Sequence, residues 1–283
     1  MSERWRYPIA GRPATLSIRK NQLQLLTPAF DLAAFFDHVR RADHRVLFLD
    51  YDGTLAPFHI DRAKAVPYPE IKAILPSLLR LPHCRTVIVS GRAVADLARL
   101  IGVQPLPEIW GSHGWEHLSA DGTYSLAALD EASVVALRRA GEILDALKLP
   151  NLREDKPVSV AAHWRGLPPA ESDSIRQHVQ RTWAGLITGT RLQLNPFDGG
   201  LELRVAGRDK GSVVTEILAE FASDVASAFL GDDLTDEDGF RAMSDKGLRV
   251  LVRPALRETL ADLWLTPPNE LVDFLVRWKE ASR

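Results

Sequence analysis

The sequence predicts an α/β protein whose main domain is a doubly wound parallel sheet of the Rossmann type, carrying an inserted α+β module. Two observations support this fold class. Short apolar runs without polar alternation, which are typical of strands buried on both faces of a parallel sheet, alternate with amphipathic helical segments. Residues 116–204, in contrast, have the pattern of hairpins and of single helices between strands. We therefore expect a core domain that is interrupted by a smaller one.

The parallel domain is expected to begin after an irregular N-terminal extension, residues 1–28, which contains several prolines. A helix is predicted over 32–41, followed by a buried strand over 45–49. Three more apolar runs of the same kind predict further strands, and two amphipathic segments predict helices. These strands cover 86–89, 226–230 and 248–252, and the helices cover 69–81 and 210–221.

The inserted module is predicted to start with a hairpin over 114–126, because apolar and polar residues alternate around Asp121-Gly122. The remaining elements are expected in this order: a helix over 131–147, a strand over 158–164, a helix over 170–183, and strands over 191–194 and 201–205 joined across 198–200. The predicted division of the chain is therefore a core of residues 29–115 and 205–283 and a cap of residues 116–204.

The composition is that of an ordinary globular protein, with 283 residues of which 46% are hydrophobic and 25% charged. The formal net charge of −2 gives no overall positive field, so neither nucleic acid nor a membrane is an expected partner. No apolar run reaches the roughly 18 residues of a membrane-spanning helix. Cys84 is the only cysteine, which favours a reducing, cytoplasmic location. The sequence sets no oligomeric state, and a monomer is compatible with it.

Two carboxylates stand directly after the first predicted strand, in Asp50-Tyr51-Asp52-Gly53-Thr54. In an open α/β sheet, ligands bind beyond the carboxyl ends of the strands. Asp50 and Asp52 can both face that crevice when the chain turns at Gly53. This segment is therefore the strongest candidate for the chemical centre of the protein.

A second acidic cluster, Gly231-Asp232-Asp233-Leu234-Thr235-Asp236, follows the strand at 226–230. Two such clusters at one end of a sheet gather several negative charges, and each like pair at ~4 Å costs roughly 4 kcal/mol at an effective dielectric constant of about 20. A hard divalent cation with oxygen ligands relieves this repulsion, and Mg²⁺ also bridges to phosphate. The alternative is that these acids only cap turns and helices.

Two further strand ends carry groups that suit a phosphate. Ser90-Gly91-Arg92 follows the strand at 86–89, and Asp209-Lys210-Gly211 opens the helix after the inserted module. A hydroxyl donates a hydrogen bond to a phosphoryl oxygen, and an ammonium compensates its charge. Taken alone, each segment is more often an ordinary turn or a solvated lysine. Their order along the chain and their positions give them weight.

In this order, the four segments resemble the motifs of the haloacid dehalogenase (HAD) superfamily of phosphotransferases. The insertion between Ser90 and Lys210 is similar to the C2-type cap of that superfamily. Within the superfamily, the chain resembles the trehalose-6-phosphate phosphatases over about residues 30–280. The segments that carry this likeness are Val89-Ser90-Gly91-Arg92, Gly111-Ser112-His113-Gly114, Ala162-His163-Trp164-Arg165, Leu201-Glu202-Leu203-Arg204 and residues 231–238.

The resemblance implies a HAD-like fold and a role for each matching residue. Asp50 would be the nucleophile that forms an aspartyl phosphate, and Asp52 would protonate the leaving oxygen and later activate water. Lys210 and Ser90 would orient the phosphoryl group. The cofactor would be Mg²⁺, held by the Asp50 carboxylate, the Asp52 backbone carbonyl and Asp232, with Asp233 or Asp236 bound directly or through a second shell.

The resemblance also implies that the substrate is a small sugar phosphate, whose hydroxyl groups are read by the cap. The expected substrate-binding residues of the cap are Glu154, Lys156, Arg165 and Glu202, and those of the core are Arg92, His113 and Gly114. The alternative for each cap residue is a solvated charge on a strand face. The expected activity is hydrolysis of trehalose 6-phosphate; the rivals are a phosphatase of glucosylglycerol phosphate or mannosylglycerate phosphate, and a sugar-phosphate-binding module without catalysis.

Overall fold

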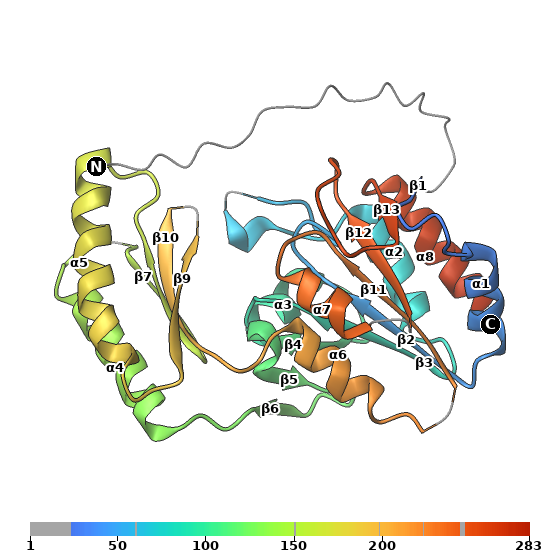
Figure 1. Cartoon of the computed structure of the whole chain (residues 1–283), viewed down its shortest axis with the longest axis horizontal. Coiled ribbons are helices and arrows are strands. Elements are labelled where there is room, and N and C mark those ends of the chain that lie inside the picture. Colours follow the sequence, from blue (N-terminus) through green and yellow to red (C-terminus); the bar gives the residue numbers. More distant parts are fainter. Residues whose placement is uncertain (1–23, 60, 150, 198, 223, 244–246) are drawn as a thin grey trace.

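The computed structural model describes residues 24–283 except 60, 150, 198, 223 and 244–246. Its strands form two separate sheets, a large one of nine strands and a small one of four (Figure 1). Residues 1–23 of the predicted N-terminal extension lie outside the described residues. No helix within the described ranges is long and apolar enough to cross a membrane.

The large sheet is parallel in its middle and antiparallel at both edges. The neighbouring strands from β13 to β4 are all parallel, whereas β1 and the β5–β6 hairpin pair antiparallel with them. In spatial order the strands are β1 (Gln24–Leu25), β13 (Leu263–Leu265), β12 (Gly247–Val252), β11 (Val225–Gly231), β2 (His44–Leu49), β3 (Cys84–Val89), β4 (Glu108–Gly111), β5 (Glu116–Leu118) and β6 (Tyr124–Leu126).

Helices cover both faces of this sheet, as a doubly wound fold requires. One face packs against α1 (Leu32–Arg41), α2 (Pro69–Leu78), α3 (Val94–Ile101) and α8 (Asn269–Ala281), and the other against α6 (Lys210–Leu218) and α7 (Asp236–Met243). Strand β2 shows why its sequence does not alternate. Leu47 and Leu49 join the first hydrophobic core while Val46 and Phe48 join the second, and all four are fully buried. The predicted fold class is confirmed.

Helix α6 starts where it does because of a capping box. The Asp209 side chain accepts a hydrogen bond from the Ser212 backbone N–H at 2.7 Å, and the Ser212 hydroxyl accepts one from the Asp209 N–H at 3.1 Å. These bonds satisfy backbone donors that the first helical turn leaves without a partner. The cap therefore fixes Lys210 at the first position of the helix, next to the carboxyl end of β2.

The small sheet and its two helices form the inserted module. Its strand order is β7 (Arg153–Lys156), β8 (Ser159–His163), β10 (Gly200–Val205) and β9 (Leu192–Phe197), all antiparallel, and it packs against α4 (Glu131–Asp145) and α5 (Pro169–Ile187). Trp183 and Leu203 lie at the centre of its own hydrophobic core and are fully buried. Figure 1 shows this module beside the large sheet, with α4 and α5 on the side away from that sheet and the small sheet on the side toward it.

The predicted hairpin at 114–126 exists, but it belongs to the large sheet. Strand β5 pairs antiparallel with β4, and β6 extends the edge further. The alternating pattern indicates a hairpin without indicating its partner strand, because pairing between distant segments has no local signature. The division of the chain stays a proposal, and this pairing favours placing the start of the cap after Leu126 instead of after Trp115.

Two connections join the module to the core, and Arg191 contacts both. On the outgoing side, its guanidinium lies 5.4 Å from the centre of the Trp115 ring, whose backbone carbonyl accepts a hydrogen bond from Ala127 at 2.9 Å. On the returning side, the Arg191 carbonyl accepts a hydrogen bond from the Ala206 N–H at 2.6 Å. Both connecting segments therefore contact the same residue, Arg191.

Several boundaries differ from the predicted ones. Helix α2 ends at Leu78 instead of residue 81, and α6 ends at Leu218 instead of residue 221. Strand β4, with helix α3 before it, and the C-terminal pair of β13 and α8 have no counterpart among the predicted elements. Strand β4 is only four residues long and begins with a buried glutamate, Glu108, so its apolar run is too short to stand out.

Candidate active site

The predicted site residues meet in a cavity of about 420 Å³ between the carboxyl ends of the core strands and the small sheet of the cap. Most of them line it, and both domains contribute. The lining residues are Asp50, Asp52, Phe58, His59, Arg62, Ser90, Gly91, Arg92, His113, Glu154, Lys156, Ala161, His163, Arg165, Phe197, Glu202, Lys210, Asp232, Asp233 and Thr235. A pocket of this size and polarity suits a small polar ligand.

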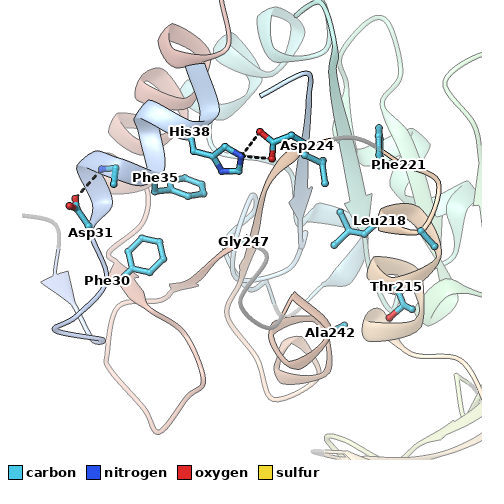
Figure 2. Close-up of a pocket in the computed structure, with 13 residues that line it drawn as sticks. Phe30, Asp31, Phe35, His38, Thr215, Leu218, Phe221, Asp224, Ala242 and Gly247 are labelled. Carbon is cyan, nitrogen blue, oxygen red and sulfur yellow. Dashed lines mark hydrogen bonds and ion pairs between the residues drawn. The ribbon is translucent and has the colours of Figure 1, made fainter. Parts of the chain in front are cut away.

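A larger cavity, about 720 Å³, lies at the opposite, amino ends of β11 and β12. Figure 2 shows its wall of α1 and α6 side chains, including Phe35 and Leu218, and the His38–Asp224 ion pair at 2.9 Å. None of the predicted site residues lines it. Volume therefore does not locate the functional site in this molecule, whereas the gathering of charged groups does.

Lys210 and two aspartates form the innermost part of the site. The Lys210 ammonium donates to Asp50 Oδ1 and to Asp236 Oδ1, each at 2.6 Å. All three side chains are buried. The other Asp236 oxygen, Oδ2, accepts the backbone N–H groups of Asp232 and Asp233 at 3.0 and 2.9 Å. Asp236 is thus a structural anchor that holds both Lys210 and the second acidic loop.

Asp232 completes an acidic trio with one unsatisfied oxygen. Carboxylate oxygens of Asp50, Asp232 and Asp236 all lie within 4.8 Å of one another. Asp232 Oδ1 is buried and has no hydrogen-bond partner. A buried carboxylate oxygen without a donor is unfavourable and calls for an explanation such as a cation. The side chain of Asp233 lies outside the trio, although this residue lines the cavity.

The close packing of the trio requires a glycine at position 53. Gly53 has φ of +82°, and a Cβ atom there would lie 2.2 Å from Asp232 Oδ2. Both conditions exclude an ordinary side chain. The turn in the Asp50–Thr54 segment therefore serves to bring the two acidic loops together, as the sequence pattern predicts.

The electrostatics of this centre reflect its crowding. Burial raises the pKa of Asp232 to about 9, and the neighbouring Asp50 and Asp236 carboxylates add to the shift. Burial and Asp236 raise the pKa of Asp50 to about 7, although Lys210 acts in the opposite direction. Burial opposes the charge of Lys210, but Asp236 and Asp50 outweigh it and raise the pKa of the ammonium. Lys210 therefore keeps its positive charge, but this one charge does not compensate the negative charges of the neighbouring aspartates.

Asp52 lies in the outer part of the core site, where Arg92 holds it. The Arg92 guanidinium donates from Nε and Nη2 to the two Asp52 oxygens, both at 2.6 Å, and from Nη1 to the Arg62 backbone carbonyl at 2.9 Å. Arg92 is buried, whereas Asp52 is partly open to the cavity. A bidentate pair of this kind fixes the orientation of the carboxylate. The sequence predicted a contact of Arg92 with the substrate; in this structure its guanidinium contacts Asp52, the Arg62 carbonyl and the Tyr51 ring.

Ser90 and His113 approach the cavity from the ends of β3 and β4. Ser90 is buried, and its hydroxyl accepts the Arg92 backbone N–H at 3.2 Å. Burial and the surrounding cations Arg204 and Lys210 lower the pKa of His113 well below its usual value, so its imidazole is neutral. Gly114, in contrast, is not part of the cavity wall: its Cα faces Val213 of α6, where a Cβ atom would approach to 2.5 Å.

The cap wall presents paired charges. Glu202 Oε1 accepts hydrogen bonds from the Lys156 ammonium and the Ser159 hydroxyl, both at 2.8 Å. Burial acts to raise the pKa of Glu202, but Lys156 and these hydrogen bonds lower it overall, so the carboxylate is ionised. Beside this pair, Glu154 contacts His163 Nε2 at 2.7 Å and Arg62 Nη1 at 3.4 Å. The Arg62–Glu154 contact joins core and cap across the cavity.

Several residues that line the cavity were not predicted from the sequence. Phe58 lies in the irregular segment after the Asp50–Thr54 turn, and Arg62 begins the short 3₁₀ helix η1 (Arg62–Lys64) that follows. Phe197 lies at the end of β9, with its ring 5.2 Å from that of His163. Arg165, which was predicted, also lines the cavity. No periodic pattern marks residues in such loops. Only the unusual exposure of Phe58, 73% of its surface, sets it apart, and that is visible only in the structure.

The structure has a HAD-like fold. The structure is similar to that of BT1666 from Bacteroides thetaiotaomicron, described as a phosphatase of the haloalkanoate (HAD) enzyme superfamily, with a TM-score of 0.55 and 17% identity over 83% of this chain and 95% of that one. It is also similar to the C-terminal domain of a trehalose-6-phosphate phosphatase from C. albicans, with a TM-score of 0.71 and 22% identity over 90% and 99% of the two chains.

The chain belongs to the trehalose-phosphatase family, whose family model matches residues 48–260. A relative in Mycobacterium ulcerans, named trehalose-phosphate phosphatase, is 32% identical over 247 residues. That match covers 82% of this chain and 60% of the relative, so the chain spans less than two thirds of that protein. The family resemblance predicted from the sequence is confirmed.

Proposed function

We propose that this protein is a Mg²⁺-dependent phosphatase that hydrolyses trehalose 6-phosphate to trehalose and phosphate through a phosphorylated Asp50. The observation that carries the proposal is the buried pair of Asp50 and Lys210, 2.6 Å apart, beside the unsatisfied Asp232 oxygen and beneath a polar cap wall. Membership of the trehalose-phosphatase family supports the choice of substrate. The single cysteine supports a cytoplasmic setting.

The residues present fit a magnesium ion. The raised pKa values of Asp50 and Asp232 and the orphaned Asp232 oxygen are the signs of a site that lacks positive charge. The Asp50 and Asp232 carboxylates and the Asp52 backbone carbonyl would hold the ion, with Asp233 and Asp236 around them. When bound, Mg²⁺ would neutralise the carboxylates and the phosphate dianion so that the two can approach.

In the first half of the reaction, an Asp50 oxygen bonds to phosphorus while the bond from phosphorus to the sugar oxygen breaks. Lys210 keeps the Asp50 carboxylate in place through its 2.6 Å contact and offsets the charge of the phosphoryl oxygens. The Ser90 hydroxyl, at the edge of the same cavity, donates to one of them. Asp52 supplies the proton that the leaving sugar oxygen requires.

In the second half, water bonds to phosphorus, its proton passes to Asp52, and the Asp50–phosphorus bond breaks. Free phosphate leaves, and Asp50 is restored. Asp52 serves both halves because it gives one proton and receives one. Arg92 donates one hydrogen bond to each Asp52 oxygen, and each oxygen keeps a second lone pair that can carry the proton.

The cap wall suits the hydroxyl groups of a sugar. Lys156 pairs with Glu202, and Glu154 pairs with Arg62, so the wall presents donors and acceptors in two balanced pairs. Such a wall can exchange its internal hydrogen bonds for those of a neutral polyhydroxyl ligand without leaving a charge unpaired. This arrangement supports a sugar phosphate whose distal part is uncharged, such as trehalose 6-phosphate or glucosylglycerol phosphate, over mannosylglycerate phosphate with its carboxylate.

A phosphate-release assay over a panel of sugar phosphates tests the proposal. We expect the highest kcat/KM for trehalose 6-phosphate, loss of activity with EDTA and recovery with Mg²⁺. Ca²⁺ should bind but support little turnover, because its larger and looser coordination misplaces the reacting groups. Binding of trehalose 6-phosphate without any phosphate release would instead identify a non-catalytic binding module. A preference for another sugar phosphate would keep the chemistry and replace the substrate.

A further inference from the structure

The Ser90-Gly91-Arg92 turn, which faces the phosphate end of the cavity, is clamped from behind by a second turn. The second turn is η2 (Ser112–Gly114), which follows β4. Its Ser112 N–H donates to the Arg92 carbonyl at 2.7 Å, and its His113 N–H donates to the Ser90 carbonyl at 2.9 Å. The backbone of the first turn is therefore tied at both ends to the second.

The two turns can approach this closely because each carries a glycine at the contact. A Cβ atom at Gly91 would lie 2.6 Å from His113 Nε2, and one at Gly111 would lie 2.9 Å from the Arg92 carbonyl oxygen. Real Cβ atoms do not approach other atoms so closely. The position of the first turn is therefore set by the second turn with little room for adjustment.

The second turn has an unfavourable backbone conformation. Ser112 and His113 have φ of +48° and +57°, in the left-handed region that residues other than glycine, asparagine and aspartate rarely adopt. Such conformations persist only where surrounding contacts impose them, and they cluster at functional sites. The Ser112 hydroxyl shows which contact imposes this one, because it donates to the carboxylate of Glu116.

Glu116 is a buried carboxylate that the reaction described above does not use. Only 2% of its surface is exposed. Besides the Ser112 hydroxyl, it accepts the Val94 backbone N–H at 3.4 Å and the Tyr124 hydroxyl at 3.2 Å. Val94 is the first residue of α3 and follows the Ser90-Gly91-Arg92 turn. Glu116 thus connects the strained turn to the chain that leaves the phosphate-facing turn.

We propose that Glu116 and Ser112 are positioning residues, which hold the η2 turn in its left-handed conformation and thereby fix Ser90 and the Gly91 backbone at the phosphate end of the cavity. This inference rests on the proposed phosphatase function, because it assigns the phosphoryl group to that end. It adds two residues that touch neither substrate nor metal. It also gives a reason for Gly111 and Ser112, which do not line the cavity.

The first test compares Glu116→Ala with Glu116→Gln. We expect Glu116→Ala to lower kcat by roughly 10- to 100-fold, because a small displacement of a group that positions the phosphoryl moiety has effects of that size. The loss should be equal for a sugar phosphate and for a small aryl phosphate. Glu116→Gln should restore most of the activity, since its carbonyl oxygen can accept from Ser112 and its amide can donate to the Tyr124 hydroxyl.

Glu108 supplies the matched control. It is a second buried carboxylate, 6% exposed, on β4 next to β5, and its partners are Arg85, Trp110 and His117. It stands at the amino end of β4, away from the η2 turn. Glu108→Ala should therefore lower the melting temperature while kcat and the affinity for phosphate stay at wild-type values. If Glu116→Ala behaves in the same way, Glu116 is structural only and the proposal is wrong.

Calorimetric titration with inorganic phosphate in the presence of Mg²⁺ gives a readout that is independent of turnover. The Kd for phosphate should rise about tenfold or more in Glu116→Ala and stay unchanged in Glu108→Ala. A wild-type protein that binds phosphate without releasing it from any ester would contradict the proposed function, and the comparison of Kd values would still decide the role of Glu116.

Two Ser112 variants keep the proposal testable if Glu116→Ala does not fold. Ser112→Ala loses the hydroxyl that holds the strained conformation, whereas Ser112→Gly also loses it but adopts a φ of +48° freely. We therefore expect Ser112→Gly to retain more activity and tighter phosphate binding than Ser112→Ala. Wild-type phosphate binding in Ser112→Ala would overturn the proposal.

Discussion

The two halves of the active-site cavity are built in opposite ways. On the core side, Asp50, Lys210 and Asp232 are at most 4% exposed, and Asp236 joins them through hydrogen bonds to the Lys210 ammonium and to the Asp232 backbone N–H. On the cap side, Glu154 and His163 keep about a third of their side-chain surface in solvent, and the contacts join side chains to one another. The core side is therefore rigid before any substrate arrives, whereas the cap side can rearrange.

From this difference we expect the core side to carry out the reaction and the cap side to recognise the substrate. A buried charged group that is held by several partners cannot adapt to a new ligand, and electrostatic stabilisation of a transition state requires just such fixed groups. A half-exposed ion pair such as Glu154–His163 can exchange its partner at little cost, because solvent screens both states. We expect substitutions on the core side to affect every phosphate ester and substitutions on the cap side to affect only sugar phosphates.

The largest expected effect is that of Asp50→Asn. An amide cannot attack phosphorus, so turnover should fall by several orders of magnitude for all phosphate esters. Lys210 keeps its 2.6 Å contact with Asp236, and the variant should therefore melt at or above the wild-type temperature. Beryllium fluoride, which mimics an aspartyl phosphate, should bind the wild type and not the variant. Near-wild-type turnover in a clean preparation of the variant would exclude a phosphorylated Asp50.

Glu202→Ala probes the cap side. Charged hydrogen bonds contribute about 1.5–3 kcal/mol each, so loss of a carboxylate that binds sugar hydroxyls should lower kcat/KM for trehalose 6-phosphate by roughly 10²-fold. Hydrolysis of a small aryl phosphate should barely change. Asp155→Ala is the matched control, because Asp155 lies on β7 of the same sheet but pairs with Arg153 outside the cavity. Equal losses on both substrates in Glu202→Ala would contradict the division between chemistry and recognition.

The stability of the metal-free protein should also depend on pH, and the pKa values of the core-side aspartates give the direction of the change. The pKa values of Asp50 and Asp232, about 7 and about 9, lie above the ordinary value of 3.8. Between the ordinary and the raised values, the folded metal-free protein therefore holds more protons than the unfolded chain. Its stability is expected to fall as pH rises through this window. Mg²⁺ displaces these protons, and its affinity should rise by up to about tenfold per pH unit for each proton displaced.

Thermal melting in EDTA and in Mg²⁺ across this pH range measures both effects. The melting temperature in EDTA should decline with rising pH, and the difference between the two curves should widen. A melting temperature in EDTA that rises with pH through the same window would show that the acidic trio does not govern the pH response of the core.

The smallest expected effect is that of Arg62→Ala, which removes the contact between core and cap. Arg62 and Glu154 are partly exposed and 3.4 Å apart, and such pairs contribute about 0.2–1 kcal/mol. We expect a change of less than about fivefold in kcat/KM for trehalose 6-phosphate. Lys64→Ala, which removes an exposed pair with Asp61 on the same segment, should have no effect. A loss as large as that of Glu202→Ala would assign Arg62 a direct contact with the sugar.

The sequence was most informative where a local pattern determines the structure. Each predicted strand of the parallel sheet exists, because a run that is apolar on both faces has few other places in a fold. Asp50, Ser90, Lys210 and Asp232 meet in the structure because the strands before Asp50, Ser90 and Asp232 are parallel neighbours and end at one edge of the sheet. The resemblance to a known family added the roles, which no spacing alone supplies.

The sequence was least informative about pairing between distant side chains. Arg92 and Asp52 are 40 positions apart and Lys156 and Glu202 are 46 apart, and nothing local indicates that each pair is in contact. The pairing of the β5–β6 hairpin with β4 has no local signature either, so the sequence pattern did not indicate that the hairpin extends the large sheet. Phe58 lies in an irregular loop and Arg62 at the start of a single helical turn, and the course of both depends on the tertiary structure.

Because Arg191 contacts both segments that connect the cap to the core, the cap is joined to the core at a single place. The chain leaves the large sheet after β6 and returns before α6, and the two crossing points share one seam around Trp115 and Ala206. The cap has its own hydrophobic core, so its removal leaves no hole in the larger one. Over evolutionary time, recombination at this seam could replace the whole inserted module in one event and leave the acidic centre of the large domain unchanged.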